Sequence, residues 1–117
     1  MSDPALDPTV IETLRQLSEP GGPDVVEEVF QIFLTETPAR LADIDEAISI
    51  GNLTQVHRLA HSLKGSAGNI GARAMFAACR ELDDEARGGK ADRIAGLVAL
   101  VRFEYQRVVT DIEHRRA

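Results

Sequence analysis

The sequence predicts an all-α protein, an up-down four-helix bundle with an additional short N-terminal helix or helices. Apolar residues recur three or four positions apart in every segment, and no segment shows strand alternation between hairpin turn signals. Connections of only about one to five residues make successive helices antiparallel neighbours. The chain is 44% hydrophobic over 117 residues, so we expect residues 1–117 to form a single domain around one core.

Turn residues divide the first half of the chain into three predicted helices, over 8–17, 23–37 and 38–50. A proline stands in the first turn of each, where its missing N–H has no helical partner to lose. The second helix should stop near Thr37 and Pro38. Thr37 is expected to cap the third helix, with Pro38 in its first turn.

The second half of the chain predicts three longer helices, over 53–68, 72–87 and 94–112. Asn52 caps the first of them, and Gln55 three residues later completes a capping-box pattern. A glycine pair halts the second. In the third, apolar residues alternate by four and three, which is the heptad pattern of a bundle seam.

Composition and charge argue against several classes of function. Lys and Arg number 13 against 19 Asp and Glu, a net charge of -6, which disfavours nucleic acid as a partner. The lone Cys79 excludes an internal disulfide and two-cysteine metal motifs, and we expect it to be a buried, inert thiol in a reducing compartment. No apolar run approaches the roughly 20 residues of a membrane span, and the first residues resemble no leader, so we expect a cytoplasmic protein without a membrane partner.

The predicted helix over 53–68 carries the residues with chemical potential. On a helical wheel its apolar face contains Val56, Leu59, Ala60, Leu63 and Ala67. His61, Lys64 and Gly65 form a separate stripe, so the imidazole should project into solvent beside a cation. With a reference pKa of about 6.5, an exposed imidazole is largely unprotonated and nucleophilic near neutral pH. A glycine inside a helix costs roughly 0.5–1 kcal/mol, and its benefit here would be room for another protein.

The run from Ala60 to Ala72, AHSLKGSAGNIGA, closely resembles the signature of histidine-containing phosphotransfer (HPt) domains, A-H-x-L-K-G-[SA]-[SA]-x-x-[IL]-G-A. The resemblance implies a four-helix bundle whose exposed His61 receives a phosphoryl group from an aspartyl phosphate on a receiver domain and passes it to another receiver. Lys64 and Gly65 match the positions that support the phosphate and keep the site open. The implied partners are receiver domains of response regulators or hybrid histidine kinases.

The residues themselves are consistent with a phospho-carrier. Phosphoryl transfer needs a positioned nucleophile and charge neutralisation, which His61 and Lys64 can supply. No ATP-binding motif is present, so we expect a phosphotransfer intermediate rather than an enzyme with its own ATP site. No carboxylate cluster is evident beside His61, so we expect no metal and no cofactor of its own, with Mg²⁺ on the partner receiver. We also expect a monomer.

Several residues allow a second interpretation. His57 and His61 are spaced to clip a metal, but Arg58 stands where a metalloprotease has glutamate, so we interpret His57 as a solvated flank. Three arginines recur every seven residues, and they form either a solvated face or positive charge near the phosphate. Apolar residues on the second helix exceed its core stripe, and they face either the first helix or a partner. These two sets are Arg73, Arg80 and Arg87, and Val25, Ile32 and Leu34.

Two functions of other classes remain as alternatives. A histidine-kinase dimerisation-type helix pair also presents a phosphorylated histidine, but it typically carries H-E-[LI]-[KR]-T-P. Here Ser62 replaces the acid and no Thr-Pro follows. The other alternative is a non-phosphorylated helical adaptor in which the stripe around His61 has no chemical role.

Overall fold

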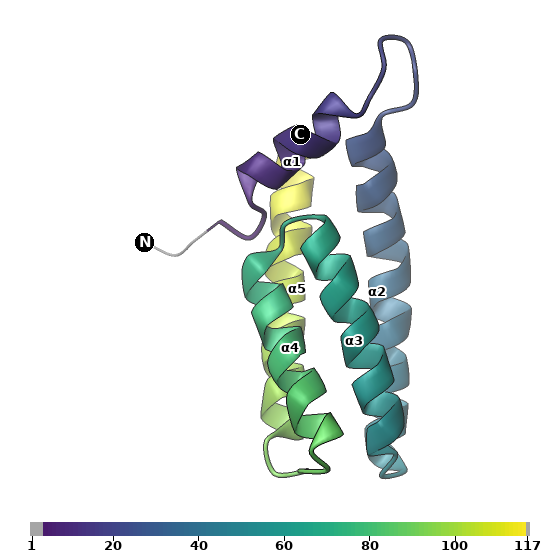
Figure 1. The fold of residues 1–117 in the computed structure, drawn as a ribbon, viewed down its shortest axis with the longest axis vertical. Helices are drawn as coiled ribbons and strands as arrows, with labels where there is room; N and C mark the ends of the chain where they lie inside the picture. The colour runs from purple at the N-terminus through teal and green to yellow at the C-terminus, as the bar shows by residue number, and fades with distance from the viewer. Residues whose placement is uncertain (1–3, 117) are drawn as a thin grey trace.

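The computed structural model describes residues 4–116, and within them the chain forms helices and no strand. The helices are α1 (Pro8–Gln16), α2 (Val25–Ser49), α3 (Leu53–Asn69), α4 (Arg73–Arg87) and α5 (Ile94–Arg116). Helices α2 to α5 run alternately up and down as a bundle, and the short α1 crosses one end of it (Figure 1). The predicted fold class is therefore confirmed. Residues 1–3, on which the expectation about a leader partly falls, and residue 117 lie outside the described residues.

Helix α2 corrects the predicted boundary at Thr37 and Pro38. A single helix runs through both residues, so the helices predicted over 23–37 and 38–50 are one. A proline inside a helix costs about 3 kcal/mol, but burying a large apolar side chain gains about 1.5–3 kcal/mol, and the stripe of α2 continues beyond the proline. Its buried members are Val26, Phe30, Phe33, Thr37, Leu41, Ile44 and Ala47. Thr37 is thus a core residue rather than a cap.

The helix starts follow local capping chemistry. The Asn52 side chain accepts a hydrogen bond of 3.1 Å from the backbone N–H of Gln55, which confirms the cap predicted for α3. Helix α2 begins at Val25, two residues later than expected. Asp24 caps it, its side chain accepting from the N–H of Glu27, and Pro23 precedes the helix instead of opening it.

The N-terminal segment braces the turn between α3 and α4. The backbone N–H of Asp7 donates to the carbonyl of Gly71 at 2.8 Å, and Leu6 is bonded to Asp111 of α5. Gly71 has a φ of 73°, and a Cβ added there would lie 2.8 Å from the Cβ of Val10. Only glycine satisfies both the left-handed backbone and this close approach, so the end of α3 is fixed from outside the hairpin.

Helix α3 packs against α4 along its length, with α2 on its other side (Figure 1). Four residues of its predicted apolar face are fully buried and Leu59 is partly buried: Val56, Ala60, Leu63 and Ala67. With that face in the core, the opposite face points into solvent. No helix within residues 4–116 is long and apolar enough to cross a membrane.

Candidate functional site

The structure places the predicted stripe of α3 at the surface. The His61 side chain is 65% exposed, as expected from the helical wheel. Gly65, one turn further, is exposed, and a Cβ added there would meet no atom within 4 Å. The chain's own packing therefore does not require glycine at this position. Lys64 differs from expectation, because its side chain is only 22% exposed and leans towards α4.

The centre of the site is a carboxylate that the sequence analysis missed. Asp83 of α4 has no exposed side-chain surface. Its Oδ1 is bonded to Nδ1 of His57, and its Oδ2 lies 3.4 Å from Nδ1 of His61. Lys64 Nζ at 3.5 Å and a guanidinium nitrogen of Arg87 at 3.4 Å approach the same Oδ2. One buried anion thus receives four donors from two helices.

His57 is consequently not the solvated flank that the spacing indicated. Its ring is half-buried against α4, and its centroid is 6.4 Å from that of His61. In an antiparallel pair of helices joined by the turn at 70–72, residues equally far from the turn lie opposite each other. Residue 83 of α4 therefore lies opposite residue 59 of α3, midway between the two histidines. An acidic residue at that register, one helical turn from the buried Cys79, was the available signal.

The site shifts the ionisation of Asp83. Burial alone raises the pKa of this carboxyl, but hydrogen bonds from His57 and His61, together with the charges of His57 and Arg87, lower it below its ordinary value of 3.8. The carboxylate is therefore ionised near neutral pH and can only accept hydrogen bonds. Each histidine that bonds to it must carry its proton on Nδ1. The lone pair of the neutral His61 ring then lies on Nε2, the atom turned away from Asp83.

The three arginines of α4 separate by environment. Arg87 joins the Asp83 cluster, as the second interpretation of these residues allowed. Arg73 instead pairs with Asp7 and helps to hold the N-terminal segment, and Arg80 is exposed. The site thus combines two cations, Lys64 and Arg87, with one buried carboxylate, so these three groups together place a positive balance of charge beside His61.

No group of three or more His, Cys, Asp or Glu side chains within residues 4–116 is arranged to hold a metal ion. Although two histidines and a carboxylate meet at Asp83, both rings aim Nδ1 at that carboxylate and bond to it directly. Cys79 is buried, as expected, and burial raises the pKa of its thiol to about 12, which leaves it protonated and unreactive near neutral pH.

An apolar groove runs beside the stripe, between α1, α2 and α3. Its walls include Ile32 of α2, which is 57% exposed, and Ser66 and Asn69 of α3. Of the surplus apolar residues on α2, Val25 and Leu34 are partly buried, so only Ile32 is clearly available to a partner. On a helical wheel Asn69 lies on the opposite side of His61 from Lys64. The stripe therefore separates this groove from the Asp83 cluster.

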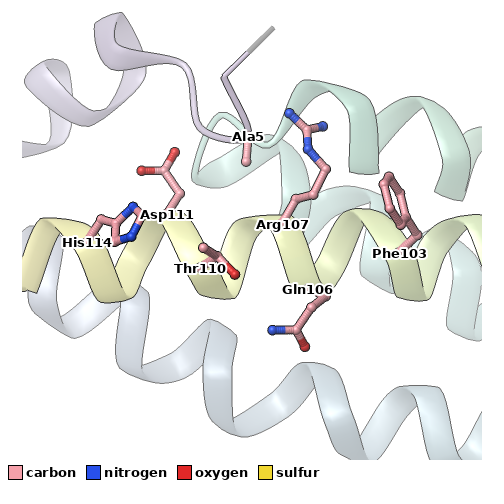
Figure 2. Close-up of a pocket in the computed structure, with 7 residues that line it drawn as sticks. All are labelled: Ala5, Phe103, Gln106, Arg107, Thr110, Asp111 and His114. Carbon is pink, nitrogen blue, oxygen red and sulfur yellow. The ribbon is translucent and has the colours of Figure 1, made fainter. Parts of the chain in front are cut away.

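A second depression lies on α5 (Figure 2). It is lined by side chains of that helix, including Phe103 and Asp111, together with Ala5 of the N-terminal segment. None of its lining residues belongs to the Asp83 cluster or to the stripe of α3.

Comparison with known proteins decides between the interpretations. The family model described as Hpt domain matches residues 28–113. The chain belongs to the Hpt domain family. The crystal structure of histidine-containing phosphotransfer protein B (HptB) from Pseudomonas aeruginosa superposes with a TM-score of 0.86 at 28% identity, covering 99% of each chain. The resemblance noted from the run at residues 60–72 is confirmed.

Curated relatives give the Hpt domain its functional context. The phosphorelay protein LuxU of Vibrio vulnificus is 32% identical over 89 residues, which cover 75% of this chain and 77% of LuxU. Histidine-containing phosphotransfer protein 4 of Arabidopsis thaliana is 26% identical over 103 residues, covering 86% of this chain and 81% of that protein. Histidine phosphotransfer within a phosphorelay is the function of this Hpt domain.

Proposed function

We propose that His61 is the phosphorylated residue and that the phosphoryl group travels between receiver domains through its Nε2. The observation that carries this proposal is the pairing of an exposed ring with a buried carboxylate, His61 with Asp83. Among the three histidines, which all lie within the described residues 4–116, only His61 combines high exposure with a partner there that fixes its tautomer. His57 is half-buried, and His114 lies near the end of α5.

The chemistry follows from the tautomer. The Nε2 lone pair attacks the phosphorus of an aspartyl phosphate, a P–N bond forms, and the P–O bond to the receiver aspartate breaks to release a carboxylate. No proton has to leave Nε2, since the ring proton is on Nδ1. The ring gains a positive charge, which the Asp83 carboxylate stabilises. Attack on the phosphorus by a second receiver's aspartate reverses every one of these changes.

The remaining parts of the machinery come from the partner. We propose that a receiver domain docks over the stripe of α3 and the groove beside Ile32, and that it supplies the Mg²⁺. Asp83 supports this division because its oxygens are already engaged by four donors. Lys64 and Arg87 neutralise charge on the phosphoryl group, and open space at Gly65 admits the receiver pocket. The chain acts as a carrier without an ATP site of its own.

The test uses a receiver domain phosphorylated on aspartate, without ATP. Acid-labile, base-stable label should appear on the wild-type protein and be absent from His61→Gln, with helicity unchanged because the ring makes no core contact. His114→Gln is the matched control, and it should accept label like the wild type. Label that persists in His61→Gln would move the site to another residue. The helical-adaptor alternative predicts no label on any variant.

A further inference from the structure

Asp83 has to be held in place for its contact with His61 to matter. The three approaches to Oδ2, from His61, Lys64 and Arg87, all span 3.4–3.5 Å, which is the long edge of hydrogen-bond geometry. Arg87 has a side chain that is 60% exposed, and both cations sit on long, flexible chains. None of these contacts fixes the orientation of the carboxylate.

His57 makes the closest of the four contacts, and it reaches the other oxygen, Oδ1. Its imidazole is half-buried, short and stiff compared with a lysine or arginine side chain, so little freedom is lost when the bond forms. An imidazole that donates to Oδ1 turns Oδ2 towards His61, one helical turn away on α3. The two histidines therefore share one carboxylate: His57 bonds to Oδ1, and His61 lies beside Oδ2.

We propose that His57 is a positioning residue for phosphotransfer: its Nδ1–H anchors Asp83, and the anchored carboxylate keeps the His61 proton on Nδ1 and the nucleophilic lone pair on Nε2. This proposal deepens the proposed function and rests on it. Removing the anchor lets the carboxylate rotate or turn towards the two cations. The neutral His61 ring is then free to hold its proton on either nitrogen, and only one of the two forms can attack phosphorus.

Two variants of His57 isolate the anchoring bond. In His57→Asn the side-chain amide can place an N–H close to the position of the imidazole Nδ1, whereas His57→Leu has similar bulk and no donor. The first readout is the tautomer of His61 in the unphosphorylated protein, from long-range nitrogen-proton NMR of the ring. It needs no receiver, so it is independent of the proposed phosphotransfer. We expect one tautomer in the wild type and His57→Asn, and a mixture in His57→Leu.

The second readout is the rate of label acceptance from a phosphorylated receiver. Loss of one hydrogen bond should slow His57→Leu about threefold to tenfold, and His57→Asn should lie within about twofold of the wild type. A folded His57→Leu protein with the wild-type tautomer and rate would overturn the proposal. If the wild type accepts no label while the tautomers differ as expected, the proposed function fails and the anchoring role stands.

A double-mutant cycle covers the case in which His57→Leu acts by loosening the fold. Because His57 is proposed to act through Asp83, the leucine substitution should change the acceptance rate little in an Asp83→Asn background. Additive losses in the double variant would show that His57 acts by another route and would contradict the proposal. Urea unfolding of all four proteins reports the fraction folded, so that rates are compared per folded molecule.

Discussion

Oδ2 of Asp83 lies 3.4 Å from Nδ1 of His61, and the carboxylate that makes this contact has no exposed surface. Asp83→Asn removes the charge while keeping the shape. On the proposed mechanism, the positive His61 ring formed by phosphorylation then loses its counter-charge. A hydrogen bond to a charged group is worth about 1.5–3 kcal/mol, and a contact this long supplies the lower part of that range. We expect acceptance to slow about tenfold, measured with a phosphorylated receiver.

Asp84 provides the matched control for this prediction. It is the next residue of α4, and its side chain is 63% exposed. Its Oδ1 lies 3.7 Å from a guanidinium nitrogen of Arg87, whereas Asp83 contacts the two histidines. Asp84→Asn carries the same change of charge and should accept label at the wild-type rate. Equal slowing in both variants would mean that the net charge of α4, and not the contact with His61, sets the rate.

The depressed pKa of Asp83 also predicts how stability depends on pH. The pKa of Asp83 in the folded protein lies below its ordinary value of 3.8. The carboxylate therefore stabilises the fold at pH values above 3.8, and this contribution is lost as the pH falls through the pKa of the folded protein. The difference in unfolding free energy between the wild type and Asp83→Asn should hold its pH 5 value until about pH 4 and shrink below it. Urea unfolding at a series of pH values measures this. A difference that grew towards acid would contradict the assigned direction.

The sequence predicted the bundle because every level of local information agrees over most of the chain. At Pro38 the local signals and the tertiary packing disagree. A threonine followed by proline is a helix start by local rules, but the apolar residues on either side keep one helical register across it. Burial of Leu41 and Ile44 against the other helices outweighs the hydrogen bond lost at Pro38. Rules that consider only the neighbouring residues in the sequence do not include this free energy of packing.

Only the part of the site that lies on one helix could be predicted from the sequence. Exposure of His61 and Gly65 follows from the periodicity of one helix, so the sequence was sufficient. Asp83 and the altered roles of His57 and Lys64 depend on pairing between two helices, which periodicity within each helix does not report. The position of the short turn could have supplied the register, but a charged residue on an apolar face was the feature that needed explanation.

The Lys64 ammonium lies 3.5 Å from Oδ2 of Asp83, and on the proposed mechanism it also neutralises charge on a phosphoryl group carried by His61. Lys64→Ala should slow acceptance several-fold without abolishing it, since a single partly screened charge contact is worth on the order of 1 kcal/mol. The effect should be largest at low ionic strength. Lys90→Ala removes the chain's only other lysine, which lies between α4 and α5, and should be neutral. Matching rates for wild type and Lys64→Ala at low salt would show that Lys64 does not assist transfer.

Ile32 tests where the receiver docks. It is exposed in the groove beside the stripe of α3, and replacing it with serine removes apolar contact area at the centre of the proposed interface. We expect weaker binding of a receiver, by about 1–2 kcal/mol, measured by titration calorimetry. Ile50→Ser is the control, because Ile50 is 71% exposed at the turn after α2, away from the groove. Equal binding by both variants would place the receiver elsewhere.

Substitutions at Gly65 can distinguish an effect on helix stability from an effect on the approach of a receiver to His61. Because a Cβ at this position would meet no atom within 4 Å, Gly65→Ala and Gly65→Leu should fit without strain and raise the unfolding free energy by up to about 1 kcal/mol. Gly96 of α5 is equally open, and its alanine and leucine variants control for the gain in helix propensity. Unfolding midpoints and acceptance rates are measured on the same variants.

Transfer should depend on side-chain size at Gly65 alone. Alanine adds one methyl group and should slow acceptance little, whereas leucine one turn from His61 occupies the space through which a receiver's aspartyl phosphate must reach Nε2. A Gly65→Leu protein that is more stable than the wild type and yet slow would show that glycine is kept for access, since its own fold gains from the substitution. If the glycine, alanine and leucine proteins transfer equally fast, clearance is not its role, and the open surface beside His61 does not limit the approach of the receiver.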